Sequence, residues 1–343
     1  MDGTTTLDRA RAGDGDAFEA LLEPHRRELL VHCYRILGSL QDAEDVLQEV
    51  LMSAWRALER FDGRSLRAWL YRIATNRCLN FLRDETRRPQ SVLIAEPVPK
   101  GDGGLVSSDE PWWLEPYPDA LIDDAAASPE ARYDSRESIA LSFIAGLQRL
   151  PARQRAVLVL RDVLGFSASE VAGILGTTAT SVNSALVRAR SGLPPDGRPD
   201  LVPLPRSSIE TDILDRFIHA LEYGNVEQLV ALLTQDAKLI MPPEPLECHG
   251  ARAIAEFIQQ RSFWGQQLTF VRTRVNNQPA FGYYRPDPHS SISRAGGLMV
   301  LTLGEDKITT LTRFGDKGIL ARCGLPRTVA FDGSARSREP RRG

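Results

Sequence analysis

The chain has 343 residues, and its 42% of apolar residues is enough for the cores of two or three domains. No stretch approaches 18 consecutive apolar residues and the first residues lack an apolar run, so we expect neither a membrane span nor a signal peptide. Four cysteines without CxxC spacing predict buried free thiols in a reducing compartment, and hence a cytoplasmic protein: Cys33, Cys78, Cys248 and Cys323.

The net charge of −3 is spread unevenly along the chain. Residues 60–88 carry eight Arg against three acids, and residues 149–190 carry six Arg against two acids. Residues 94–137, between them, carry eleven acids against three bases. Two basic modules separated by an acidic connector predict contacts with nucleic acid that the average charge conceals.

Residues 5–88 predict a helical module. Apolar residues at helical spacing indicate helices over 17–37, 42–58 and 66–83, and Pro24 predicts a break or kink in the first of them. The third helix has a basic and amide row opposite its apolar stripe, formed by Trp69, Arg72, Asn76, Asn80 and Arg83. Such a row suits a phosphate backbone and unstacked bases. A solvated helix face, with Trp69 half-buried between helices, is the alternative that the spacing leaves open.

Residues 139–193 predict a second module, in which Ser167–Arg190 has the pattern of a helix-turn-helix. Ala172 is small where two helices must cross, and Gly176 can adopt the positive φ that the turn needs. The second helix would bury one face and present short polar and basic side chains on the other, within reach of bases and phosphates. Taken alone, the stretch also fits a surface hairpin of two helices.

Two blocks of sequence resemble a known family. DAEDVLQEVLMSAWRAL at 42–58 and WLYRIATNRCLNFLRD at 69–84 look like region 2 of the extracytoplasmic-function (ECF) sigma factors of bacterial RNA polymerase. LQRLPARQRAVLVLRDVLGFSASEVAGILGTTATSVNSALVRAR at 147–190 looks like region 4 of the same family. The resemblance implies a sigma factor that binds core RNA polymerase and promoter DNA, and that melts the DNA to initiate transcription.

The resemblance also implies the residues of three surfaces. The acidic second helix would dock on the largest subunit of core polymerase, and the core-binding residues would be Asp42, Glu44, Asp45, Gln48 and Glu49. The second-largest subunit of core polymerase is also an expected partner. The −10 element would be opened, and a flipped base captured, by Arg64, Trp69, Arg72, Asn76, Asn80 and Arg83. The −35 element would be bound in its major groove by Thr178, Thr180, Ser181, Asn183, Ser184 and Arg188. Melting of this kind makes and breaks no covalent bond, so no catalytic residue, cofactor or metal is expected.

Residues 89–138 are rich in Pro, Gly, Asp and Ser and predict a linker that is mostly extended or disordered. Its apolar segment Pro111–Asp119 would be costly to leave in water. The segment is similar to the tryptophan-proline linker motif of ECF factors with a C-terminal extension, and we expect Trp112, Trp113 and Tyr117 to dock on the C-terminal domain. A small local cluster packed on the second module is the alternative.

We expect a Pro-rich linker at residues 194–206 and a third domain at residues 207–330. We expect residues 331–343 to form a basic disordered tail. The third domain shows an α+β order with a curved antiparallel sheet. Its predicted helices are 209–223, 226–233 and 251–261, and its predicted strands are 237–241, 268–276, 278–285, 297–304 and 307–314. This order resembles the SnoaL-like cone, some members of which are cyclases or isomerases. Ionisable candidates for its pocket stand at no fixed catalytic spacing: Asp236, Glu247, His249 and Asp316. We expect a regulatory interface, with sensing of a small ligand and catalysis as alternatives.

The whole chain is therefore expected to be a multidomain ECF sigma factor of the SigG and SigJ kind. Two all-α sigma domains would precede an α+β SnoaL-like domain, and family logic implies that this domain regulates the sigma factor. Two other classes of protein fit parts of the chain. One is a ligand-responsive helix-turn-helix regulator that binds duplex DNA alone, and the other is a SnoaL-like enzyme with a targeting module.

Overall fold

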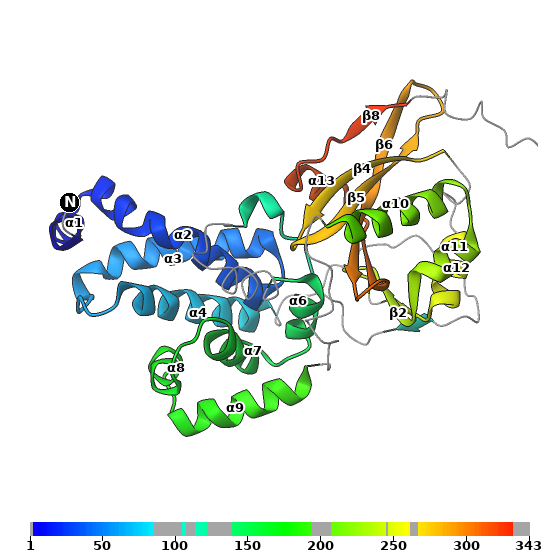
Figure 1. Cartoon of the computed structure of the whole chain (residues 1–343). Coiled ribbons are helices and arrows are strands. Elements are labelled where there is room, and N and C mark those ends of the chain that lie inside the picture. The colour runs from blue at the N-terminus through cyan, green and yellow to red at the C-terminus, as the bar shows by residue number, and fades with distance from the viewer. Residues whose placement is uncertain are drawn as a thin grey trace, which may run out of the picture. The chain divides into compact units, whose positions relative to one another are not determined.

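The structure is a computed structural model that describes residues 3–85, 105–107, 114–122, 139–193, 207–244, 246–260 and 267–331. It divides into two compact units (Figure 1). The first unit holds residues 1–95 with 113–196, and the second holds residues 96–112 with 197–343. The predictions for Trp112 and Trp113, for the linker at 194–206 and for the tail beyond residue 331 lie outside the described residues.

The first unit begins with a helical N-terminal module. Its elements are α1 (Gly3–Arg11), α2 (Gly15–Leu37), α3 (Leu40–Ala57), a 3-10 turn η1 (Leu58–Arg60) and α4 (Leu66–Glu85). Helix α2 continues through Pro24, so the proline does not end it. The sequence defines the junction of α2 and α3 closely, because Gly38 adopts a left-handed φ of 78° and the Ser39 side chain accepts a hydrogen bond from the Asp42 amide.

A helix-turn-helix module completes the first unit. It contains α6 (Leu141–Gln148), α7 (Ala152–Leu158), a π-helical turn η3 (Val159–Val163), α8 (Ala168–Leu175) and α9 (Ala179–Gly192). Ser167 and Glu170 form a reciprocal capping box at the start of α8, and Gly176 ends α8 with a φ of 60°. Thr178 then caps α9 by accepting a hydrogen bond from the Ser181 amide. The positive φ expected at Gly176 is thus present, and the two caps are additions that the structure shows.

The second unit is the C-terminal domain, an α+β fold. Its helices are α10 (Ser208–Glu222), α11 (Val226–Leu232), α12 (Ala251–Gln259) and α13 (Lys317–Arg322). Its strands are β1 (Leu105–Ser107), β2 (Leu233–Ile240), β3 (Leu246–His249), β4 (Thr269–Val275), β5 (Gln278–Pro286), β6 (Ile292–Leu303), β7 (Ile308–Phe314) and β8 (Thr328–Ala330). The sheet order is β1-β3-β2-β7-β6-β5-β4, and β8 pairs with β6.

The C-terminal sheet differs from the expected antiparallel one in its strands and in its pairing. Strands β1, β3 and β8 are additions that the sequence analysis missed. Strand β2 pairs with β7 in parallel, and the chain between them passes through β3, α12, β4, β5 and β6. Strand β6 begins at Ile292, five residues before the predicted start. A tight turn at Glu305–Asp306 joins β6 to β7, and the Gly304 amide there donates to the Lys307 carbonyl oxygen over 2.7 Å.

An apolar core fills the space between the C-terminal helices and the sheet. Phe217 of α10 packs on Phe281 of β5 with ring centroids 6.0 Å apart, and Phe270 of β4 meets the same ring at 5.4 Å. Ile254 of α12 and Leu311 of β7 are fully buried in the same cluster. The helices are therefore held on the sheet by ordinary hydrophobic packing.

A buried histidine lies at the contact of α2 with α4. His32 is fully buried, and its Nε2 lies 2.9 Å from the Thr75 hydroxyl, which itself donates to the Tyr71 carbonyl oxygen over 2.7 Å. Nε2 must therefore carry the imidazole proton, since the hydroxyl proton is already used. Burial is the main cause that lowers the pKa of His32 to about 3, and the charge of Arg35 adds to it.

The first prediction concerns acid stability. The unfolded chain binds a proton at His32 below about pH 6.5 and the folded chain does not until about pH 3, so stability falls as pH falls through this window. Between pH 7.5 and 5.5 the first unit should lose about 1.4 kcal/mol through this group alone. His32→Gln keeps an N–H donor without a titrating group, and it should remove that loss in urea unfolding.

The exposed His289 of the C-terminal domain supplies the control. His289→Gln should leave the pH dependence of the first unit unchanged. An equal slope in wild type and in His32→Gln would contradict the assignment.

Candidate nucleic-acid interface

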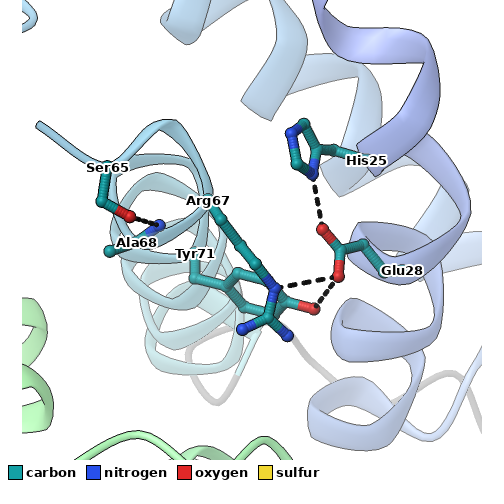
Figure 2. Close-up of polar contacts among 6 residues, drawn as sticks. All are labelled: His25, Glu28, Ser65, Arg67, Ala68 and Tyr71. Carbon is teal, nitrogen blue, oxygen red and sulfur yellow. Dashed lines mark hydrogen bonds and ion pairs between the residues drawn. The ribbon is translucent and has the colours of Figure 1, made fainter. Parts of the chain in front are cut away.

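A network around Glu28 positions α4 on α2 (Figure 2). Arg67 Nε and the Tyr71 hydroxyl, both on α4, donate to Glu28 Oε2 over 3.1 and 3.2 Å. His25 Nδ1 lies 2.6 Å from the other oxygen of Glu28. Burial disfavours the charged carboxylate, but the hydrogen bond with His25 and the charge of Arg67 outweigh it and lower the pKa of Glu28. The start of α4 is thus fixed by an ionised, fully engaged carboxylate.

The exposed face of α4 carries the predicted −10 residues. Arg72, Asn76, Asn80 and Arg83 are exposed, as a row at helical spacing requires. Trp69 is only 8% exposed and packs on Phe61 with ring centroids 5.0 Å apart. The tryptophan therefore joins α4 to the preceding loop, and its ring is less open to a base than the row suggested.

A pocket of about 400 Å³ lies between α3 and α4. Its lining is Ser53, Ala57, Trp69, Arg72, Ile73, Asn76, Arg77 and Asn80. Four of the six predicted −10 residues thus lie together, while Arg64 and Arg83 do not line the pocket. The volume is within the usual range for small-ligand pockets, and two guanidinium groups beside two amides suit a phosphate and the edge of a base.

Arg77 is a lining residue that the sequence analysis missed. Its Nη2 donates to the Ser53 hydroxyl over 2.8 Å, and its Nη1 lies 3.6 Å from Glu49 Oε2. Arg77 lies one helical turn after Ile73, between the two faces of α4 that the sequence predicted, so the spacing assigned it to neither face. Its contacts become evident only from the position of α3. Arg77 therefore connects the pocket to a residue of the predicted polymerase surface.

The loop before α4 is ordered by local bonds. Asp62 Oδ1 accepts a hydrogen bond from the Arg64 amide over 3.1 Å, and Gly63 adopts a φ of 79°. The Arg64 side chain is 89% exposed and lies 3.7 Å from Asp62. This guanidinium is available to a partner, since a surface pair of this kind is weak.

The predicted polymerase surface lies along α3. Asp45, Gln48 and Glu49 are exposed, whereas Asp42 and Glu44 are half-buried. The exposed stripe continues into two large apolar side chains, Met52 and Trp55, which are 50% and 40% exposed. Acidic groups followed by exposed apolar groups on one helix face are typical of a protein-binding surface.

All six predicted −35 side chains are exposed on helix α9 and its N-cap, namely Thr178, Thr180, Ser181, Asn183, Ser184 and Arg188. Its other face is buried through Val182, Leu186 and Ala189. Arg190, further along the helix, is engaged in a bidentate bond with Asp162 at 2.8 and 2.7 Å. The amphipathic division expected from the sequence therefore holds through the part of the helix that would enter a groove.

The two helical modules pack on one another within the first unit. Asn76 Nδ2 of α4 donates to the Ile174 carbonyl oxygen of α8 over 3.3 Å. Phe166, just before α8, meets Tyr71 with ring centroids 5.4 Å apart and lies 5.2 Å from the Arg67 guanidinium. Helix α8 therefore lies against α4 at Asn76, which is one of the predicted −10 residues.

A buried arginine adds a polar contact between the modules. Arg155 of α7 is 6% exposed, and its Nη1 donates to the Ile36 carbonyl oxygen of α2. Its other bonds reach Gln148 Oε1, Gln148 O and Leu150 O at 2.5, 3.0 and 3.2 Å. Burial lowers the pKa of Arg155 to about 10, because these acceptors are neutral oxygens.

The connector docks on the N-terminal module at Glu115 and Tyr117. The Glu115 amide donates to the Gly38 carbonyl oxygen over 2.8 Å, and the Tyr34 hydroxyl donates to the Glu115 carbonyl oxygen over 2.7 Å. Tyr117 is fully buried, and its ring lies 4.9 Å from that of Tyr34. The expectation that Tyr117 packs on the C-terminal domain is wrong, because α2 offers an aromatic ring and a helix end that engage the connector instead.

The C-terminal domain does not gather its ionisable candidates into one site. Asp316 caps α13 by accepting from the Gly318 amide over 2.8 Å, and Asp236 is exposed on β2. Glu247 and His249 bond to each other over 2.9 Å on β3. Among the described residues, no group of His, Cys, Asp and Glu could hold a metal ion. In the same part of the chain, no helix is long and apolar enough to cross a membrane.

Comparison with known proteins agrees with both helical modules. The family model "Sigma-70 region 2" matches residues 21–88, and "Sigma-70, region 4" matches residues 141–193. The ECF RNA polymerase sigma factor SigG of Mycobacterium tuberculosis is 42% identical over 324 residues, which cover 92% of this chain and 85% of that protein. SigW of Bacillus subtilis is 29% identical over 189 residues, or 54% of this chain and 92% of that protein.

A solved structure resembles the whole architecture. The crystal structure of the M. tuberculosis ECF sigma factor SigJ covers 90% of this chain and 99% of its own, with a TM-score of 0.59 and 22% sequence identity. The chain therefore belongs to the ECF sigma factors of the sigma-70 family, with helical regions 2 and 4 followed by a SnoaL-like domain. Members of this family are transcription initiation factors rather than enzymes.

The second prediction concerns the contact between regions 2 and 4. Phe166→Ala removes the ring that packs on Tyr71 and Arg67, and it should cost about 3–5 kcal/mol of stability in the first unit. Amide hydrogen exchange should rise most in α8 and along α4. Val187→Ala, at a side chain 68% exposed on α9, should change stability by less than about 0.5 kcal/mol. Equal exchange in α4 for the two variants would show that Phe166 does not join the regions.

Proposed function

We propose that this sigma factor binds core RNA polymerase through α3, recognises a −10 element through α4 and a −35 element through α9, and melts the DNA to initiate transcription. The single observation that supports this most is the pocket between α3 and α4, which collects Arg72, Asn76 and Asn80 beside Trp69. Capture of an unstacked base there would repay the few kcal/mol that unstacking costs, since each base contact is worth about 1–3 kcal/mol.

Promoter binding requires the two regions to separate. Elements centred at −10 and −35 lie about 85 Å apart at 3.4 Å per base pair. In the free chain, Asn76 of α4 bonds to Ile174 of α8, and α8 leads directly into the recognition helix α9. The packed first unit is therefore a closed form, and core polymerase would hold the open form. This also explains why the helix-turn-helix alone should not suffice for promoter binding.

We further propose that the C-terminal domain regulates the sigma regions and does not catalyse a reaction. Its ionisable candidates are dispersed, and its interior is filled by packed apolar side chains around Phe281. The domain would act through the connector, part of which pairs with its sheet.

The third prediction tests the function by transcription. Core polymerase of M. tuberculosis, the source of the 42% identical relative, would be combined with the full chain and with a chain ending at residue 205. Templates with randomised −35 and −10 positions would be transcribed, and the transcripts sequenced. An enriched pair of elements at fixed spacing is expected. Absence of any enriched sequence with both chains would contradict the proposal, as would specific binding of duplex DNA without polymerase.

Variants of the same assay separate the surfaces. Asn80→Ala should lower permanganate reactivity of −10 thymines about tenfold, corresponding to the loss of a base contact of about 1.4 kcal/mol, without weakening core binding. Asp45→Ala with Glu49→Ala should weaken core binding without changing the enriched sequence. Glu19→Ala, a change at an exposed residue of α2 that belongs to neither predicted set, serves as the control. A normal open complex with Asn80→Ala would exclude the pocket as the base site.

A further inference from the structure

Part of the connector forms a strand of the C-terminal domain. Residues Leu105–Ser107 form β1, which pairs antiparallel with β3 in the register Leu105 to Cys248, Val106 to Glu247 and Ser107 to Leu246. The connector joins region 2 to region 4 in sequence, so this strand comes from the middle of the sigma half. It is the one described segment from before residue 207 in that sheet.

Strand β3 needs such a partner on physical grounds. It is four residues long and pairs with β2 on one side, so without β1 its other edge would present unpaired backbone N–H and C=O groups. An extended peptide added to an exposed edge satisfies these groups by main-chain hydrogen bonds. Three paired residues form a short ladder, which can exchange more readily than the long pairings of β5 and β6.

The same connector is anchored a second time within the first unit. After residues 108–113, the Glu115 amide bonds to the Gly38 carbonyl oxygen, and Glu115 Oε2 accepts from the Gln41 amide over 3.1 Å. Tyr117 is buried there against Tyr34. A short covalent segment therefore lies between a strand held by the C-terminal domain and a segment held by region 2.

We propose that the C-terminal domain binds the connector by strand addition, with residues 105–107 as the bound peptide, and that it regulates the sigma regions by retaining or releasing this strand. The proposal rests on the proposed function, because it names the contact through which the domain acts. While β1 is retained, less of the connector can extend between regions 2 and 4 as they separate on promoter DNA. Retention of β1 is therefore inhibitory, and its release favours the open form.

A disulfide can test the pairing in the full chain. Leu105 lies directly opposite Cys248, and opposed residues of an antiparallel pair have Cα atoms about 4.5–5.5 Å apart, within the range that a disulfide bridges. Leu105→Cys should therefore form a bond to Cys248 when the protein is oxidised with copper phenanthroline. The bond would be detected on a non-reducing gel and assigned by peptide mass spectrometry.

A neighbouring position gives the matched control. Val106 pairs with Glu247 and belongs to the other face of the strand, so Val106→Cys should not crosslink to Cys248. Adding Cys248→Ser to Leu105→Cys should abolish the crosslink. No crosslink at position 105, or an equal yield at position 106, would overturn the strand pairing.

Transcription with the crosslinked protein tests the regulatory step. Oxidised Leu105→Cys should give about fivefold less transcript or lower from an enriched promoter, and reductant should restore it. Oxidised wild type and oxidised Val106→Cys control for effects on the polymerase. Equal transcription from the crosslinked and the reduced protein would overturn the regulatory role. No transcript from the reduced protein would overturn the proposed function instead, and the crosslink yields would still decide the strand pairing.

Discussion

The buried guanidinium of Arg155 joins region 4 to region 2. It reaches the Ile36 carbonyl oxygen across the contact of the two regions, and its other acceptors are neutral oxygens of its own module. A buried charge without a carboxylate partner is costly, and burial accordingly lowers its pKa to about 10. If the regions separate as we propose, the guanidinium would lose the Ile36 acceptor and become accessible to water.

Helix α4 is the element on which both the closed form and the proposed function depend. Its inner side is fixed to α2 by Glu28 (Figure 2), and its exposed side carries the amide and guanidinium groups of the pocket. Helix α8 contacts it through Asn76, one of the residues proposed to contact DNA. On the proposed function, promoter binding and the packing of region 4 would compete for the same helix. The proposed regulation by the C-terminal domain would act on this competition and would need no catalytic chemistry.

Much of this organisation could be predicted from the sequence, because it depends on local rules. Periodic apolar residues located α2, α3 and α4, and Gly176 located the turn of the helix-turn-helix. What the sequence could not show depends on tertiary partners. Arg155 bonds to a main-chain oxygen 119 residues away, Tyr117 is buried by Tyr34, and β1 is a strand only because β3 has a free edge. Trp69 was placed on the exposed row by spacing, whereas Phe61 covers it.

Regions 2 and 4 are packed together in the free chain, and we propose that they separate on the promoter. Spin labels at Glu23→Cys on α2 and Ser191→Cys on α9 would report their distance by double electron–electron resonance, since all four native cysteines are buried. We expect one short distance between the two labels in the free protein, and a distance longer by tens of ångströms in the complex with core polymerase and promoter DNA. The same distance in both states would contradict it.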